Sequence, residues 1–145
     1  MVRVHGSSVA IDGQGVLLRG PSGSGKSDLA LRLIDQGAAL VADDQTELSR
    51  NGDRLDMTPP ATIAGLIEVR GVGIVPMSHL PSAALRLVVD LAPQIEIERM
   101  PEPRFCEFEG ISIPVLSLDP FAASAPAKLR LALKAASMEG AAPKP

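Results

Sequence analysis

Short apolar segments separated by polar turns run along the whole chain, and two stretches among them have helical periodicity. From residue 26 to residue 36, apolar side chains recur three and four positions apart, as on one face of an α-helix. Gly37 stands where such a helix is expected to end. A similar spacing recurs at residues 127–137. The pattern therefore predicts one helix in the first third of the chain and one near its end.

The remaining apolar segments are short and typical of β-strands. Residues 8–11 and 16–19 flank a glycine-rich turn and are predicted to form a hairpin, and Asn51-Gly52 is a strong signal for a second one. Residues 85–91 are the most apolar segment, which is typical of a central strand. The other predicted strands are residues 39–42, 46–49, 54–57, 66–69, 72–75, 95–97, 105–108 and 111–115.

Length and composition favour a single globular domain. The chain has 145 residues, of which 46% are hydrophobic and 21% charged, and a chain of this size buries enough surface to fold without disulfides. Residues 1–138 are predicted to form this domain and residues 139–145 a flexible tail. Helices among short strands indicate a domain that contains both α and β structure.

Charge and residue usage argue against several classes of partner. The net charge is -3 and aromatic residues make up 2% of the chain, and neither value favours binding to nucleic acid. No apolar run has the length of a membrane helix, and the first residues lack the apolar region of a signal peptide, so a cytoplasmic protein is expected. Cys106 is the single cysteine, which excludes an internal disulfide and a cysteine–histidine metal cluster.

A phosphate-binding loop lies between the first hairpin and the first predicted helix. Residues 20–27 match the pattern G-x-x-x-x-G-K-[S/T] in full. The glycines let successive backbone N–H groups point into one concavity, and the helix N-terminus adds a positive dipole there. Lys26 reaches the β- and γ-phosphates, and the Ser27 hydroxyl binds Mg²⁺. The residues predicted to bind the nucleoside triphosphate are Gly20, Pro21, Ser22, Gly23, Ser24, Gly25, Lys26 and Ser27.

Two consecutive carboxylates, Asp43 and Asp44, follow the strand after the first helix. Carboxylates at the carboxyl end of a strand can hold Mg²⁺ or accept a proton from an attacking hydroxyl, although such a pair is also common in turns and helix caps. The phosphate-binding loop favours the functional interpretation. Glu68 alternates with Arg70 in a pattern more typical of a solvated strand face, and His5 has no distinguishing pattern.

Four segments in this order resemble the catalytic, C-terminal domain of bacterial HPr kinase/phosphorylase. They are His5-Gly6, the phosphate-binding loop, Leu40-Val41-Ala42-Asp43-Asp44, and Ile67-Glu68-Val69-Arg70-Gly71-Val72-Gly73-Ile74. The last segment resembles a signature of the family and is far more specific than the loop. The resemblance implies an α/β P-loop domain with a mixed sheet, of the phosphoenolpyruvate-carboxykinase-like type.

The resemblance also implies roles for the matching residues. The loop with Lys26 would bind ATP, and Ser27 and Glu68 would hold Mg²⁺. Asp44 would be the general base that takes the proton from a serine hydroxyl. The residues implied beside these groups are His5 near the phosphates, Asp43 as a partner of the metal, and Arg99 as an active-site arginine.

The implied activity is that of an ATP- and Mg²⁺-dependent protein-serine kinase. Its substrate would be HPr, the small phosphocarrier of the phosphotransferase system, or a nitrogen-branch paralogue, and the family resemblance implies a homo-oligomer, specifically a hexamer. The family's N-terminal domain is expected to be absent, because the loop starts at residue 20. Residues 118–126 lack the family's Arg-Pro-Gly-Arg-Asn motif, so phosphorylase activity is not expected.

Two other functions remain compatible with the residues. A small-molecule P-loop kinase would need an acceptor pocket and a lid with arginines, for which residues 99–104 are a candidate. A non-catalytic ATP-sensing module would bind the nucleotide and transfer nothing. Turnover of a metabolite without a protein acceptor would favour the first function, and tight ATP binding without transfer would favour the second.

Overall fold

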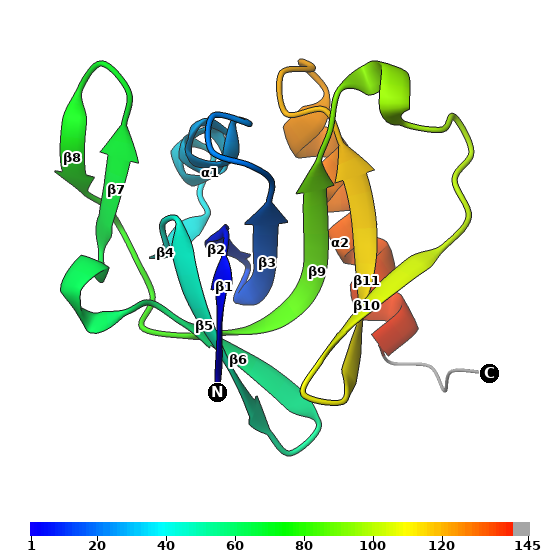
Figure 1. Ribbon diagram of the computed structural model, residues 1–145, viewed down its shortest axis with the longest axis horizontal. Helices are drawn as coiled ribbons and strands as arrows, with labels where there is room; N and C mark the ends of the chain where they lie inside the picture. Colours follow the sequence, from blue (N-terminus) through cyan, green and yellow to red (C-terminus); the bar gives the residue numbers. More distant parts are fainter. Residues whose placement is uncertain (141–145) are drawn as a thin grey trace.

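Eleven strands and two α-helices make up the described part of the protein, residues 1–140 of a computed structural model (Figure 1). Within these residues, no helix has the length and apolar character needed to cross a membrane. In chain order the elements are β1 (Val2–His5), β2 (Ser7–Ile11), β3 (Gln14–Arg19), α1 (Lys26–Asp35), β4 (Ala39–Ala42), β5 (Gln45–Asn51), β6 (Arg54–Thr58), β7 (Leu66–Val69), β8 (Gly73–Pro76), β9 (Ala83–Leu91), β10 (Arg104–Phe108), β11 (Ile111–Leu118) and α2 (Ala125–Gly140).

Nine of these strands form one mixed sheet, which confirms the predicted sheet type. The order is β1-β5-β6-β9-β3-β2-β4, and β10 and β11 join it through β9. β9 runs parallel to β3 and to β11, whereas the other neighbouring pairs are antiparallel. The predicted central strand, residues 85–91, is therefore central in fact. β7 and β8 form a separate hairpin on the α1 side of the molecule (Figure 1).

Both helices pack on one face of the sheet, and the side chains of β3 show how the two faces are divided. Val16 and Leu18 point to the helical side and belong to the same core as Leu33 of α1 and Leu129 of α2. Leu17, between them, belongs to a second core under β5, β6, β10 and β11. Because successive side chains of a strand point to opposite faces, the buried apolar run of residues 16–18 in β3 implies that both faces are covered there.

Three differences from the sequence expectations appear. The prediction of a strand at residues 95–97 is wrong, because Gln94–Glu96 forms a 3-10 turn after Pro93 and Ile95 is 93% exposed. β1 was not expected from the apolar pattern and pairs with β5. α2 continues to Gly140, beyond the expected domain end at residue 138, and residues 141–145 of the expected tail lie outside the described residues.

Candidate functional site

The loop of residues 20–25 links the end of β3 to the start of α1, as the pattern predicts. Gly25 is the N-cap of α1 with a φ of 101°, and Gly23 has a φ of 81°. Glycine adopts this left-handed backbone without steric cost, whereas other residues are strained there. No side chain caps the first turn of α1. Its N–H groups therefore remain available for an anion at the positive end of the helix dipole.

The Lys26 side chain and the Ser24 hydroxyl oxygen are both buried at the loop. Lys26 is 6% exposed, and its Nζ donates to the carbonyl oxygens of Gly20 at 2.7 Å and Pro21 at 3.0 Å. Ser24 Oγ is buried without a hydrogen-bond partner among the described residues. A buried polar atom without a partner is unfavourable, and a phosphate oxygen would satisfy it. The interior of the loop therefore fits a bound polyphosphate.

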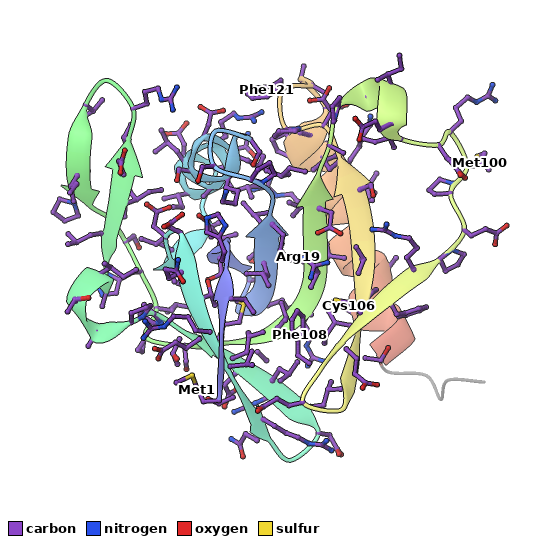
Figure 2. The ribbon with its side chains drawn as sticks, viewed as in Figure 1. Met1, Arg19, Met100, Cys106, Phe108 and Phe121 are labelled. Carbon is purple, nitrogen blue, oxygen red and sulfur yellow. The ribbon has the colours of Figure 1, made fainter. Side chains whose placement is uncertain are left out.

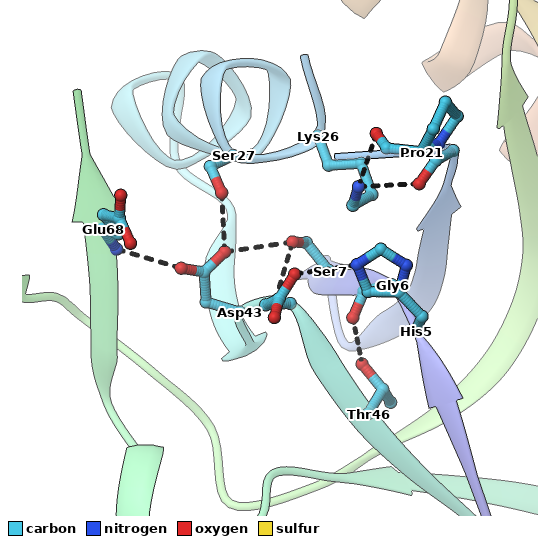
Figure 3. Close-up of polar contacts among 11 residues, drawn as sticks. His5, Gly6, Ser7, Pro21, Lys26, Ser27, Asp43, Thr46 and Glu68 are labelled. Atoms are coloured by element: carbon cyan, nitrogen blue, oxygen red, sulfur yellow. Dashed lines mark hydrogen bonds and ion pairs between the residues drawn. The ribbon is translucent and has the colours of Figure 1, made fainter. Parts of the chain in front are cut away.

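Asp43, directly after β4, holds three elements together at the mouth of the loop (Figure 3). It is 8% exposed, and its Oδ1 accepts hydrogen bonds from Ser7 Oγ at 3.0 Å and Ser27 Oγ at 2.8 Å. Its Oδ2 accepts a bond from the backbone N–H of Glu68 at 2.9 Å. A buried carboxylate needs such donors, and these three fix its orientation.

Asp44 is turned away from Asp43 and toward solvent. Its φ of 67° lies in the left-handed region, which aspartate tolerates better than most residues, and its side chain is 61% exposed. His5 Nε2 lies 2.9 Å from Asp44 Oδ1, and the backbone N–H of Asp44 donates to Ser7 Oγ at 3.0 Å. The left-handed backbone thus gives the two consecutive carboxylates opposite environments.

Hydrogen bonds also fix the backbone at Gly6, the residue before Ser7. The backbone N–H of Gly6 donates to the Asp44 carbonyl at 2.8 Å, and Thr46 Oγ1 donates to the Gly6 carbonyl at 2.9 Å. A Cβ at Gly6 would lie 2.8 Å from the Leu18 carbonyl oxygen, so this position accepts glycine alone without a shift of the strand. The start of β2 is therefore fixed against the two aspartates.

The structure brings most of the predicted site residues together at one end of the sheet. The labelled residues of this cluster are His5, Gly6, Ser7, Pro21, Lys26, Ser27, Asp43, Thr46 and Glu68 (Figure 3). Arg99 lies in the exposed loop between β9 and β10, and within the described chain no hydrogen bond or ion pair joins it to them. Its role stays a prediction.

Ser7 is the site residue that the sequence reasoning missed. It is fully buried and contacts both aspartates, although a serine at the edge of an apolar strand gives no signal of such a role. The available hint was the unusual pair Ser7-Ser8 in a segment that otherwise reads as core.

The donors at the loop mouth are suited to Mg²⁺. Ser27, Asp43 and Glu68 carry oxygen atoms, which Mg²⁺ prefers. The Ser27 hydroxyl lies 2.8 Å from Asp43 Oδ1, and the backbone N–H of Glu68 bonds to Asp43 Oδ2. Among the described residues, no three His, Cys, Asp or Glu side chains form a ready-made metal cluster. Mg²⁺ usually binds through one or two carboxylates together with substrate phosphates and water, so this sparse set is appropriate for it.

Side chains of β3, β9 and β10 form a second charged cluster, which includes Arg19, at the end of β3 that leads into the loop (Figure 2). Arg19 donates to both carboxylate oxygens of Asp90, at 2.8 and 3.1 Å, and Arg104 donates to the same carboxylate at 3.3 Å. The hydrogen bond to Asp90 raises the pKa of Arg19 above its usual value. Cys106 is half-buried beside this cluster, and burial, as the largest effect, raises the pKa of its thiol.

The thiol of Cys106 is therefore expected to react slowly with iodoacetamide. The thiolate is the reactive form, and a raised pKa lowers its fraction at neutral pH. The alkylation rate of the folded protein should still rise above about pH 9, where an unperturbed thiol is already mostly ionised. The measurement is the rate from pH 6 to pH 11, with the protein unfolded in urea as the control. A midpoint below that of the unfolded protein would contradict the prediction.

Comparisons with known proteins agree with this geometry. The model of the HPr serine kinase C-terminal domain matches residues 1–117. HPr kinase/phosphorylase of Limosilactobacillus reuteri (strain DSM 20016) is 35% identical over 127 residues, which cover 79% of this chain and 40% of that protein. The protein of the same name from Thermoanaerobacter sp. (strain X514) is 38% identical over 112 residues, 76% of this chain and 37% of that protein. The chain thus spans about 40% of the length of these curated relatives.

A solved structure shares the fold over nearly the whole chain. The structure of the HPr(Ser) kinase/phosphatase from Coxiella burnetii matches with a TM-score of 0.85 at 24% sequence identity. The match covers 98% of this chain and 100% of that one. This match confirms the predicted α/β domain with a mixed sheet, of the type found in the HPr kinase C-terminal domain.

Proposed function

The chain belongs to the HPr serine kinase C-terminal domain family, and from this premise we propose that it transfers the γ-phosphoryl group of ATP to a serine hydroxyl of an HPr-like phosphocarrier, with Mg²⁺ as cofactor. The observation that carries the proposal is the Asp44 carboxylate, which is 61% exposed and paired with His5 beside the phosphate-binding loop. A base that meets a side chain of another protein must be reachable from outside. Asp44 has this exposure, whereas Asp43 is buried.

In the proposed reaction, Asp44 accepts the proton of the serine hydroxyl while the serine oxygen forms a bond to the γ-phosphorus. The bond between that phosphorus and the bridging oxygen breaks, and ADP leaves with the electron pair. Lys26 and the N–H groups of the loop stabilise the negative charge on the phosphate oxygens. When bound, Mg²⁺ would supply further positive charge that stabilises the phosphate oxygens, and Ser27, Asp43 and Glu68 are proposed to hold it.

His5 is proposed to position Asp44 for this step. Its Nε2 occupies one carboxylate oxygen at 2.9 Å, which leaves the other oxygen of Asp44 for the serine hydroxyl. The open surroundings of Asp44 favour a protein acceptor over a small metabolite, which would need an enclosing pocket. Because residues 118–126 lack the motif associated with phosphorylase activity, we propose the kinase direction alone.

The test is transfer of label from γ-labelled ATP to purified HPr in the presence of Mg²⁺. The expected result is label on a serine of HPr and none on an HPr variant in which that serine is alanine. Omission of Mg²⁺ should abolish the transfer. Bound ATP without label on HPr, or label on a metabolite in the absence of HPr, would contradict the proposal.

Ser7→Ala is expected to lower kcat about tenfold with little change in KM for ATP. The serine hydroxyl donates to Asp43 Oδ1 and accepts from the backbone N–H of Asp44, so its loss leaves the base less well positioned. The measurement is the steady-state rate of HPr phosphorylation over a range of ATP concentrations.

Ser8→Ala is the matched control. Ser8 is equally buried, but its Oγ pairs with Thr46 Oγ1 at 3.0 Å and contacts neither aspartate. The Ser8→Ala variant should lose about as much folding stability as Ser7→Ala and keep the wild-type kcat. Equal effects of the two changes on kcat would show that Ser7 acts only through stability.

A further inference from the structure

The acidic and metal-binding groups all lie on one side of the phosphate-binding loop. Asp43 follows β4, and Glu68 belongs to β7, which lies on the α1 side of the molecule (Figure 1). A triphosphate in the loop places its terminal phosphate toward Lys26 and the metal-binding serine, Ser27. The nucleoside at the other end of the phosphate chain then points to the opposite side, where β9 lies next to β3 and β11 lies next to β9.

On that opposite side Phe121 stands against the wall of the loop (Figure 2). A Cβ on Gly25 would lie 3.2 Å from Phe121 Cζ and 3.1 Å from Pro120 Cγ, so these side chains contact the loop directly. Phe121 is nevertheless 70% exposed. A large apolar ring is therefore presented to solvent beside the position where the phosphate chain would be held.

The backbone under this ring is held without help from the ring itself. The Phe121 N–H donates to Asp119 Oδ1 at 2.9 Å, and the Ala122 N–H donates to the Asp119 carbonyl at 3.3 Å. Arg32 of α1 donates through Nη2 to the Pro120 carbonyl oxygen. The turn is thus fixed to α1, and the phenyl ring is positioned in advance of any ligand.

We propose that Phe121 is the platform on which the base of the bound nucleotide stacks. The inference rests on the proposed function, because it assumes that the loop binds a nucleoside triphosphate. An aromatic ring stacks on the flat face of a base and gains affinity from the contact. A phenyl ring offers no hydrogen-bonding group. It should therefore raise the affinity for nucleotides above that for bare polyphosphates and discriminate little between adenine and guanine.

The test compares three ligands in the presence of Mg²⁺: ATP, GTP and inorganic tripolyphosphate. Calorimetry on the Phe121→Ala variant is expected to show Kd values for ATP and GTP raised about tenfold, with the Kd for tripolyphosphate unchanged. Leu131→Ala is the control, because Leu131 is 69% exposed on α2 and should change none of the three. An unchanged Kd for ATP in Phe121→Ala would overturn the inference and leave the kinase proposal intact.

A second variant gives a direct optical signal. The chain has no tryptophan and no tyrosine, so Phe121→Trp introduces the sole indole. This variant should keep the wild-type Kd for ATP, and its emission should be quenched by ATP and not by tripolyphosphate. ATP binding without a change in emission would overturn the stacking contact. If wild-type protein bound neither ATP nor tripolyphosphate, the kinase proposal would fall together with this one.

Discussion

Asp44→Asn is expected to slow phosphoryl transfer to HPr by at least about 100-fold, because an amide cannot accept the proton of the serine hydroxyl. The substitution keeps the size of the side chain, and asparagine also accepts the left-handed backbone, with its φ of 67°, that Asp44 adopts. Folding and the Kd for Mg·ATP should therefore stay close to wild type. The measurements are the transfer rate at saturating ATP and the Kd by calorimetry.

Asp12→Asn is the matched control for this change. Asp12 also has a left-handed backbone, with a φ of 51°, and it is exposed in the turn between β2 and β3. Its substitution should leave the transfer rate unchanged. A rate for Asp44→Asn within about threefold of wild type would show that another group takes the proton. His5, which is 2.9 Å from Asp44, would then be the next candidate.

Lys26→Met is expected to raise the Kd for Mg·ATP at least about 100-fold, because a buried ammonium that faces two phosphates contributes more than one charge-assisted hydrogen bond. Methionine keeps most of the aliphatic stem and removes the charge. In the described structure the ammonium is already held inside the loop by the carbonyls of Gly20 and Pro21. The variant therefore loses a preformed phosphate ligand, and calorimetry with Mg·ATP measures the loss.

Lys134→Met removes a charge of the same kind from an exposed position on α2 and should bind Mg·ATP as wild type does. Thermal unfolding without nucleotide shows whether Lys26→Met also weakens the fold, since two carbonyls lose a donor. A Kd for Lys26→Met close to wild type would mean that the loop does not bind the triphosphate.

The parts of the site that could be predicted from the sequence are those formed by residues adjacent to one another in the chain. The phosphate-binding loop and the pair Asp43-Asp44 are each recognisable from a few consecutive residues. The loop joins a predicted strand to the predicted first helix, and the pair directly follows the predicted strand at residues 39–42. Ser7 could not be placed in this way, because its partner Asp43 is 36 positions away in the chain. Glu68 was considered for its carboxylate, whereas the structure shows its backbone N–H bound to Asp43.

The fold was predictable where apolar character and burial coincide. β3 and β9 are mostly apolar and mostly buried, and both were identified. Residues 95–97 are partly apolar, but local hydrogen bonds such as the one from the Glu96 N–H to the Pro93 carbonyl close a turn, and Ile95 stays in solvent. β1 is largely exposed at the edge of the sheet, so its pairing with β5 has no apolar pattern to reveal it.

The parallel pairing of β3 with β9 also determines when during folding the site becomes complete. Leu17 lies beside Val88, about 70 positions further along the chain, whereas β2–β3 and β5–β6 are hairpins between adjacent segments. Closing a long loop costs entropy before its contacts stabilise anything, so we expect the hairpins to form early and the β3–β9 pair to form late. The phosphate-binding loop starts at the end of β3 and reaches its final support only with that late step. We therefore expect the proposed ATP binding to report molecules that have finished folding, and partly folded chains not to compete for the nucleotide.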